Sequence, residues 1–396
     1  MFRSLLLVIP LALMGCASKP VEPKKLGYDV VLKNFIEKHG IPGGSIAVSK
    51  DGQIVHASGA GFANVETKSP VTPETPFRIA SATKPLTAIA VFQILEKSGK
   101  DLNTALNKPV FGKKGYLPEY KKIQDKRVYK ITLRDLLQHT GGWDSAKNDY
   151  DPQYDLYNIA QNMKVKAPAD AKSVIKYMLQ YRVLEVEPGK EYHYSNFGYN
   201  VLARVIEKLS GQSYEKYMQE HVFKPVGVTN MKIAGSRLQD LLPNESRYYD
   251  DPRAPEGPSQ FDNKVKGPMA YNEFYFPTMD GHGGFLGTPS DLVKIANGVT
   301  PKSGGTQLLK PETIAIMTAP VAQIGNPTAS MGWVVHYEGG EISHAGALEF
   351  ATLSYFVRNP DGTAWSVVFN RLPVKDAGEI ASIMQPLVDQ MKLELK

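Results

Sequence analysis

The sequence holds a single cysteine, Cys16, among 396 residues. It lacks paired Cys-x-x-Cys, His-Glu-x-x-His and Walker-type glycine-rich loops, so the short motifs of zinc sites and nucleotide-binding loops are missing. No serine lies in Gly-x-Ser-x-Gly, which argues against a nucleophile elbow of the α/β-hydrolase kind. No repeat with a period of roughly 20 to 50 residues occurs, which excludes a solenoid. These absences favour a compact globular protein of the size of an enzyme.

Neither sign of charge is in large excess, because the chain has 46 basic and 40 acidic residues and a formal net charge of +6. Hydrophobic residues make up 42% of the chain, enough for a large core in one big domain or two closely joined ones. Basic residues gather between 108 and 134: Lys108, Lys113, Lys114, Lys121, Lys122, Lys126, Arg127, Lys130 and Arg134. Such a run is typical of a solvated face, or alternatively contacts an anionic polymer or lipid headgroups. No stacking aromatic motif accompanies it, so we expect no nucleic-acid partner.

The N-terminus is typical of an export signal. Residues 1–15 carry Arg3 and then an apolar run too short to span a membrane stably. Leu13-Met14-Gly15-Cys16 resembles the bacterial lipobox, in which the cysteine receives lipid and becomes the mature N-terminus. The alternative is a plain cleaved signal with an incidental cysteine. We therefore expect a lipoprotein signal at 1–15, a polar tether at 16–27 and a membrane anchor on Cys16.

The folded body is expected over residues 28–396. A helical pattern at 28–39 is followed by two β-rich runs around Asp51-Gly52, a strong hairpin signal. Near the other end a second hairpin is expected around Pro360-Asp361-Gly362, followed by a helix from 376 to 395. This order predicts an α/β fold: an antiparallel sheet, from about 28–100 and 281–396, flanked by terminal helices. The signals from about 101 to 280 are mainly helical, which predicts an inserted α-helical part and a cleft where it meets the sheet.

Ser81 and Lys84 lie three residues apart at the start of the apolar run Leu86–Leu95. The first turn of a buried helix would place both side chains on one face. Burial lowers the pKa of a lysine and leaves a neutral amine, which is able to take a proton from a serine hydroxyl. Pro85 disfavours helical geometry at Lys84, so an irregular or tight first turn is expected. The alternative is a serine that merely caps the helix.

Tyr194 and Asn196 lie in a loop just before an amphipathic helix. A tyrosine beside a cationic lysine is stabilised as phenolate and can relay a proton, while an asparagine amide can bind both the lysine and a substrate carbonyl. Alternatively Tyr194 is a core residue and Asn196 caps the helix.

His344 and Gly346 lie immediately before or within an expected strand. Glycine would let a substrate backbone approach that strand closely, and the N–H of Ala347 could form half of an oxyanion hole with the N–H of Ser81. A lone histidine is more often structural, so this element gains weight only beside the other two.

Taken in order, Ser81-x-x-Lys84, Tyr194-x-Asn196 and His344-x-Gly346 resemble the three active-site elements of the serine β-lactamase and penicillin-binding-protein superfamily. The similarity extends over nearly all of residues 28–390 and is greatest to the class C β-lactamase-like group of D-aminopeptidases, D-alanyl-D-alanine carboxypeptidases and esterases. This resemblance implies that Ser81 is the acylated nucleophile, Lys84 its base, Tyr194 a proton relay and Asn196 a substrate contact. It also places His344, Gly346 and Ala347 at the substrate.

The third element departs from the pattern of that superfamily. Classical β-lactamases and most penicillin-binding proteins have a lysine there, which helps to hold a substrate carboxylate, whereas this chain has His344, mostly neutral at pH 7. The departure puts carboxylate recognition and efficient β-lactam hydrolysis in doubt.

We therefore expect a periplasm-facing, lipid-anchored serine hydrolase of a bacterial envelope, with the outer membrane favoured because Ala17 replaces the aspartate of inner-membrane retention. It would act through an acyl-enzyme on amide or ester bonds, with peptidoglycan-type D-amino-acid peptides leading. The alternatives are a carboxylesterase or weak β-lactamase and, from another class, a non-catalytic sensor that binds penicillin or wall fragments. No cofactor is expected.

Two further histidines, His139 and His282, are candidates for a metal pair. Neither has a second ligand at helical or hairpin spacing, so we expect them to be structural or to line the cleft, with no metal.

Overall fold

The computed structural model describes residues 24–252, 254–300, 305–321, 325–336, 340–349, 351–373 and 379–396. The signal expected at 1–15, the anchor expected on Cys16 and most of the tether lie outside these residues and stay predictions. Within the described ranges, no helix combines the length and the apolar character that crossing a membrane requires.

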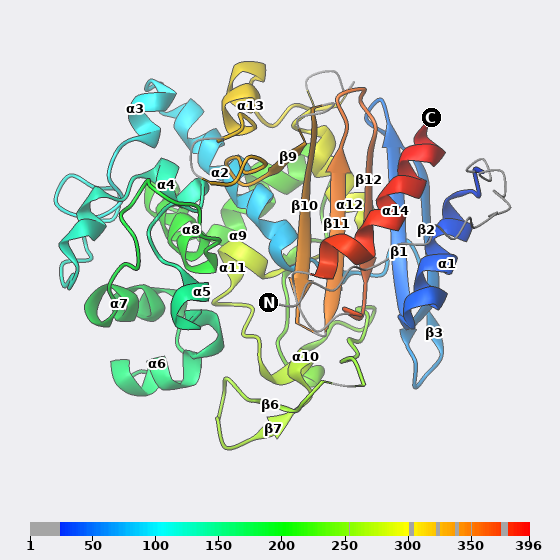
Figure 1. The fold of residues 1–396 in the computed structure, drawn as a ribbon, viewed down its shortest axis with the longest axis horizontal. Coiled ribbons are helices and arrows are strands. Elements are labelled where there is room, and N and C mark those ends of the chain that lie inside the picture. Colours follow the sequence, from blue (N-terminus) through cyan, green and yellow to red (C-terminus); the bar gives the residue numbers. More distant parts are fainter. Residues whose placement is uncertain are drawn as a thin grey trace, which may run out of the picture.

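The core of the molecule is a seven-stranded antiparallel sheet in the order β3-β2-β1-β12-β11-β10-β9 (Figure 1). Its strands come from the two ends of the chain: β1 (Gly43–Lys50), β2 (Gln53–Asn64), β3 (Ser69–Pro70), β9 (Val334–His336), β10 (Glu341–Leu348), β11 (Thr352–Arg358) and β12 (Ala364–Phe369). A three-stranded sheet has the order β4 (Phe77–Arg78), β8 (Phe285–Gly287) and β5 (Lys232–Ile233). A two-stranded sheet pairs β6 (Gly257–Pro258) with β7 (Lys266–Gly267). The predicted fold class, an antiparallel sheet with helices in an α/β arrangement, is confirmed.

Both predicted hairpins are present. Asp51 and Gly52 join β1 to β2 with φ of 52° and 80°, the two positive values that a tight hairpin turn needs. Gly362, at φ 93°, lies in the turn between β11 and β12. The central strand pair β1–β12 therefore unites chain segments more than 300 residues apart, with Gly44 opposite Phe369.

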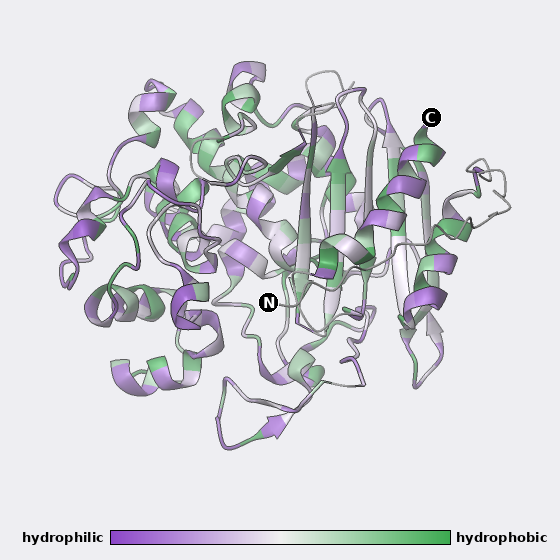
Figure 2. Cartoon of the chain, in the orientation of Figure 1, coloured by the Kyte–Doolittle hydropathy of each residue, from purple (hydrophilic) through white to green (hydrophobic). Residues whose placement is uncertain are grey.

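The terminal helices α1 (Tyr28–His39) and α14 (Ile380–Leu395) pack on one face of the sheet (Figure 1). Figure 2 shows hydrophobic and hydrophilic residues alternating along both helices, because only one side of each is buried. The strands show the matching period of two: Trp365, Val367 and Phe369 of β12 face these helices, whereas Ala364 and Val368 face the opposite core.

The other face of the sheet is covered by α12 (Pro289–Asn297) and by the turn that precedes α2 (Thr83–Lys97). Every residue of α2 from Thr83 to Gln93 is buried, as expected for a helix that is apolar on nearly every side. A second helix, α8 (Asn196–Ser210), packs against α2. The first two of the three motifs lie at the starts of these two central helices.

Most of the remaining helices fill the stretch between α2 and β8 and lie to one side of the sheet (Figure 1). They are α3 (Leu102–Leu106), α4 (Leu133–Leu137), α5 (Ser145–Asn148), α6 (Leu156–Met163), α7 (Ala171–Tyr181), α9 (Tyr214–Tyr217), α10 (Met269–Asn272) and α11 (Asp280–Gly283), with α13 (Pro311–Met317) after α12. Short turns complete the chain: η1 (Ala80–Ala82), η2 (Lys126–Lys130), η3 (Pro152–Tyr154), η5 (Lys224–Val226), η6 (Leu238–Asp240) and the π-helical turn η4 (Met218–Phe223).

Candidate active site

Ser81 lies in a tight turn at the start of the buried helix. The turn is the 3₁₀ segment η1, which leads directly into α2, so the predicted irregular first turn is confirmed. Ala80 adopts a left-handed φ of 49° immediately before the serine, a conformation that side chains other than glycine rarely hold. The residue at the N-cap of α2 is Ala82, and no side chain caps it. The alternative of Ser81 as a helix cap is therefore wrong.

Lys84 meets three oxygen atoms. Its Nζ lies 3.1 Å from Ser81 Oγ, 2.8 Å from Asn196 Oδ1 and 3.0 Å from the carbonyl oxygen of His282. The side chain is completely buried. Burial lowers the pKa of Lys84 well below its usual value, and the attraction of Asp151 opposes that shift only in part.

The neutral amine has one possible arrangement of its hydrogens. Asn196 Oδ1 and the His282 carbonyl can only accept, so they take the two N–H groups of the amine. The lone pair is then left to face Ser81 Oγ. The geometry thus presents Lys84 as an acceptor for the hydroxyl proton of Ser81, which is the arrangement a base needs.

Asn196 is held on its far side by a carboxylate that sequence reasoning missed. Its Nδ2 donates to Asp151 Oδ2 at 2.8 Å, which fixes the amide with Oδ1 toward Lys84. The helix cap of α8 is Ser195, whose Oγ accepts from the N–H of Gly198, so the capping alternative for Asn196 is also wrong. Asp151 precedes Pro152 at a turn N-cap, a signal that sequence reasoning assigns to local structure.

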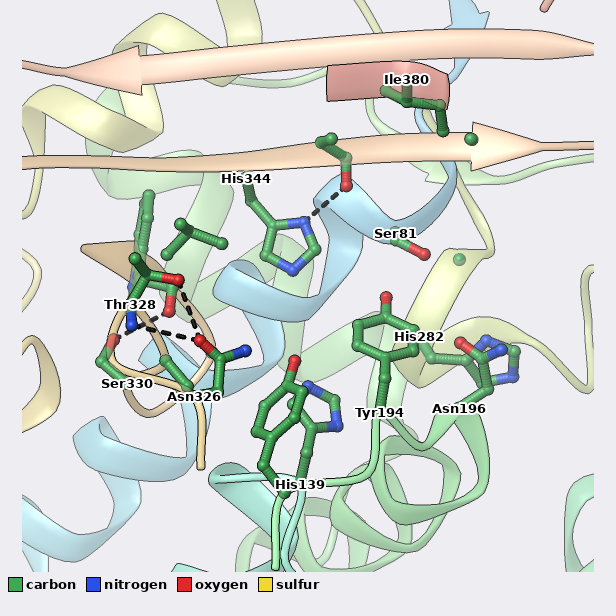
Figure 3. Close-up of a pocket in the computed structure, with 18 of the residues that line it drawn as sticks. Ser81, His139, Tyr194, Asn196, His282, Asn326, Thr328, Ser330, His344 and Ile380 are labelled. Atoms are coloured by element: carbon green, nitrogen blue, oxygen red, sulfur yellow. Dashed lines mark hydrogen bonds between the residues drawn. The ribbon is translucent and has the colours of Figure 1, made fainter. Parts of the chain in front are cut away.

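Tyr194 lies beside both members of the Ser81–Lys84 pair. The ring centroid is 4.6 Å from Lys84 Nζ, and Figure 3 shows the hydroxyl pointing toward Ser81. Although 38% of Tyr194 is exposed to the cleft, the protein around it removes enough water to raise its pKa, and its hydrogen bond with Ser81 opposes that shift only in part. The expected phenolate is therefore not favoured. Tyr194 is a neutral phenol at pH 7, with a proton to donate.

His139 and His282 both line the cleft, but they do not form a metal centre. His139 stacks on Tyr194 with centroids 4.5 Å apart, and its Nδ1 accepts from the N–H of Ser195 at 3.0 Å. Burial lowers the pKa of both histidines well below the usual value, so each is neutral. Across the part of the chain that the structure describes, no group of three histidine, cysteine or acidic side chains is arranged to hold a metal. His139 therefore positions the loop that carries Tyr194.

The third motif lies in the middle of β10. His344 Nδ1 lies 2.5 Å from the carbonyl oxygen of Ala345. Because a carbonyl oxygen only accepts hydrogen bonds, Nδ1 carries the proton of the neutral ring. The ring faces the cavity in Figure 3, with Nε2 left as an acceptor. Burial, together with the nearby Lys84, lowers the pKa of His344 to about 3. His344 is thus uncharged throughout the physiological range.

Gly346 has a different neighbour from the one expected. A Cβ at this position would lie 2.8 Å from the backbone nitrogen of Ala82 and closer still to the Ile79 carbonyl. The glycine therefore allows β10 to pack against the Ser81 turn, and the close approach of a substrate to this strand stays a prediction. Ala347 lines the same cavity as Ser81. Its pairing with the Ser81 N–H in an oxyanion hole stays a prediction.

A cavity of about 360 Å³ opens over Ser81. It is enclosed by Tyr194 and Asn196 on the α8 side, by His344 and Ala347 on β10, and by the segment from Asn326 to Val334 before and at the start of β9 (Figure 3). Among the described residues, no arginine, lysine, aspartate or glutamate lines this cavity. The walls instead offer hydroxyl, amide and imidazole groups beside apolar surface, which suits a substrate without charge at the reacting centre.

The family of the chain follows from comparison with known proteins. The family model described as "Beta-lactamase" matches residues 29–385. Since this is most of the chain, the protein belongs to the Beta-lactamase family, and the predicted resemblance is confirmed.

Two similar proteins illustrate that relationship. Protein flp of Staphylococcus aureus (strain NCTC 8325 / PS 47) is 27% identical over 202 residues, which are 51% of this chain and 37% of that protein. The human protein named "Serine beta-lactamase-like protein LACTB, mitochondrial" is 26% identical over 363 residues, covering 76% of this chain and 62% of its own length. The chain thus spans less than two thirds of either relative.

Among solved structures, D-amino acid amidase from Ochrobactrum anthropi SV3, complexed with L-phenylalanine, superposes with a TM-score of 0.71. It covers 93% of this chain and 98% of its own at 20% sequence identity, a likeness that establishes the shared fold.

Proposed function

We propose that this protein is a serine hydrolase that forms an acyl-enzyme on Ser81 and cleaves amide or ester bonds. The single observation that carries the proposal is the set of three contacts made by Lys84 Nζ, which leaves its lone pair facing Ser81 Oγ. A protein that only binds wall fragments needs no neutral amine buried beside a serine. Membership of the Beta-lactamase family supports the same chemistry.

In the proposed reaction Ser81 Oγ attacks the carbonyl carbon, and the hydroxyl proton passes to Lys84. The carbonyl oxygen becomes an oxyanion, for which the N–H groups of Ser81 and Ala347 are the expected donors. As the bond to the leaving group breaks, a proton reaches the leaving nitrogen or oxygen through the Tyr194 hydroxyl, which is itself reprotonated from Lys84. The acyl-serine is then hydrolysed by water along the reverse path, which restores Ser81 and the neutral lysine.

The cavity favours particular substrates. A substrate carboxylate beside the scissile bond would lose its hydration on binding and gain no cationic partner, which is unfavourable. No charged side chain lines the cavity among the described residues. His344 Nε2 offers an acceptor instead, which suits an amide N–H or a hydroxyl group of the substrate. Among D-amino-acid compounds of the peptidoglycan type we therefore propose amides, esters and internal peptide bonds as substrates, ahead of peptides with a free terminal carboxylate.

A matched panel tests this proposal. D-alanyl-D-alanine amide would be compared with free D-alanyl-D-alanine, next to a short-chain nitrophenyl ester and nitrocefin, with wild type and Ser81→Ala. We expect the ester and the amide to be hydrolysed by wild type only, with kcat/KM for the free dipeptide lower by about tenfold or more. Turnover of none of these substrates would contradict the proposal. A preference for the free carboxylate would overturn its substrate assignment.

We also propose that the protein is anchored to a bacterial envelope membrane and faces the periplasm. The support is the Leu13-Met14-Gly15-Cys16 sequence after an apolar leader. The full chain and its Cys16→Ala variant would be expressed in a Gram-negative host and fractionated. Retention of wild type in the membrane fraction, with release of the variant, is the expected result. Equal release of both would contradict the anchor.

A further inference from the structure

A second cavity lies at the far end of α2 from Ser81. Its volume is about 420 Å³, within the range of small-molecule sites, and it shares no lining residue with the cavity over Ser81. It is formed by the ends of α2 and α8 together with α3, α9 and η4. Its apolar wall includes Leu95, which is buried, and Leu209, which is 43% exposed. An exposed leucine beside a cavity is surface that an apolar ligand would cover.

Positive charge surrounds this apolar wall. Lys97, Lys100 and Lys108 line the cavity, and no aspartate or glutamate lines it among the described residues. None of the three forms an ion pair with any residue that the structure describes. The C-terminal ends of α2 and α8 offset about half a charge each, so a surplus of positive charge remains. Lys108 also begins the basic run noted in the sequence.

A buried donor at the cavity has no partner. Tyr217 lines the cavity and is 3% exposed, and its hydroxyl has no hydrogen-bond partner among the described residues. An unsatisfied buried hydroxyl costs stability, and this one is closed off from the cavity space, so a ligand acceptor that reaches it on binding would relieve that cost. Tyr217 is followed directly by the π-helical turn η4, whose His221 also lines the cavity. Turns of this kind are frequent at functional sites.

The carboxylate of Glu220, which adjoins the cavity residue His221, is engaged by other side chains. Glu220 accepts from Gln212 Nε2 at 2.8 Å and lies 3.8 Å from Lys216 Nζ. It also lies 4.0 Å from His221. Its charge is thus paired with residues other than the cavity lysines Lys97, Lys100 and Lys108. Lys108 Nζ lies 4.3 Å from the ring centroid of Tyr116, and Lys97 Nζ lies 5.8 Å from that of Tyr217, contacts that still leave N–H groups able to donate to an external acceptor.

We propose that this cavity is a second ligand site, separate from the catalytic one, for a small anionic amphiphile: a carboxylate with an aliphatic body. The carboxylate would meet the Tyr217 hydroxyl and the lysines, and the chain would cover Leu95 and Leu209. Such a molecule supplies an acceptor and apolar surface together, which neither an inorganic anion nor a neutral detergent does.

The test is a calorimetric titration of dodecanoate, below its micelle concentration, into protein whose Ser81 has first been blocked with a fluorophosphonate. We expect saturable binding at one site, and weaker binding of dodecyl maltoside and of sulfate. Lys97→Gln and Lys108→Gln should each weaken dodecanoate binding about threefold. The matched control is Lys122→Gln, an exposed lysine of the same basic run outside the cavity, which should bind as wild type does.

Tyr217→Phe separates a ligand contact from a structural role. If the hydroxyl waits for a ligand, its removal should weaken dodecanoate binding about tenfold and leave the ligand-free melting temperature unchanged or higher. A lower melting temperature with unchanged affinity would overturn the assignment of Tyr217. Absence of saturable binding, or equal affinity in the lysine variants and the control, would overturn the site itself. The same titration on unblocked protein completes the test, and saturable binding there that is missing from the blocked protein would place the ligand in the catalytic cavity instead.

Discussion

Asn196 accepts a hydrogen bond from Lys84 at 2.8 Å and thereby fixes where the amine directs its lone pair. The orientation of the amide is not arbitrary, because Nδ2 donates on the other side to Asp151. With the carbonyl of His282 taking the second N–H, the remaining direction is toward Ser81. The base in this site is therefore defined by what surrounds Lys84 as much as by its spacing from the serine.

Activity should depend on the neutral form of Lys84. Because burial lowers the pKa of Lys84 well below 10.5, kcat/KM for an uncharged ester should already be high at neutral pH and fall as acid protonates the amine. The raised pKa of Tyr194 keeps its proton in place, so no loss from that group is expected up to pH about 10. A pH profile of kcat/KM measures both limbs. An activity that keeps rising until pH about 10, as an unperturbed lysine would give, contradicts this assignment.

Asp151→Asn should move the acid limb to lower pH. Burial raises the pKa of Asp151, but its charged form attracts a proton onto Lys84, so removing that charge lowers the pKa of Lys84 further. The asparagine oxygen can still accept from Asn196 Nδ2, which keeps the amide in place. The same kcat/KM profile, recorded for the variant beside wild type and His344→Gln, gives the answer. His344, with a pKa of about 3, should not shape the limb. A limb that stays in place or moves upward in Asp151→Asn would show that the two groups are not coupled.

Gly346→Ala should impair both folding and catalysis. The added methyl group would meet the Ser354 hydroxyl and also backbone atoms of Ile79 and Ala82, which cannot turn aside, so β10 and the Ser81 turn must separate. We expect a loss of about 1 to 3 kcal/mol in the free energy of unfolding, together with a large fall in kcat. Chemical denaturation and ester hydrolysis measure the two effects.

The matched control for that change is Gly198→Ala in α8. A methyl group there would lie 3.7 Å from its nearest neighbours, an ordinary contact, and alanine favours a helix over glycine by up to about 1 kcal/mol. This variant should be at least as stable as wild type. If Gly346→Ala is equally well tolerated, the close packing of β10 on the nucleophile turn does not limit the site.

His344→Lys should improve the use of substrates that carry a carboxylate. The substitution would add a cation to a cavity that has none among its described lining residues. We expect kcat/KM for nitrocefin and for free D-alanyl-D-alanine to rise relative to that for a neutral ester, with KM carrying most of the change. Steady-state kinetics on the three substrates measure it. Nitrocefin hydrolysis that is already fast in wild type and unchanged in the variant would instead identify a β-lactamase proper.

The sequence predicts those parts of the fold that depend on local patterns. The turn signal at Asp51-Gly52 forms a hairpin, and the apolar spacing at 28–39 forms a helix. The hydrophobic run after Lys84 forms a buried helix. Their local chemistry dominates, because positive φ values and burial on every side are encoded within a few residues. Ser81, Lys84, Tyr194 and Asn196, which the resemblance to the superfamily's motifs identifies, come together as a group.

Contacts between distant segments could not be predicted in this way. Asp151 reaches Asn196 across 45 positions of sequence, and its own neighbourhood shows only a turn. The role of Gly346 depends on the backbone of Ile79 and Ala82, which no local pattern places against β10. The charge of Tyr194 was misjudged for a related reason: the expectation assumed a cationic lysine, whereas burial favours the neutral form of both groups.

The most direct measurement is the site of covalent labelling by a fluorophosphonate, read by intact-protein and peptide mass spectrometry. The account predicts one adduct per wild-type chain, on the peptide that contains Ser81, and none on Ser81→Ala. Lys84→Gln should be labelled more slowly by about a hundredfold or more, since it lacks the base. Equal labelling of wild type and Ser81→Ala would contradict the central claim that Ser81, activated by Lys84, is the nucleophile.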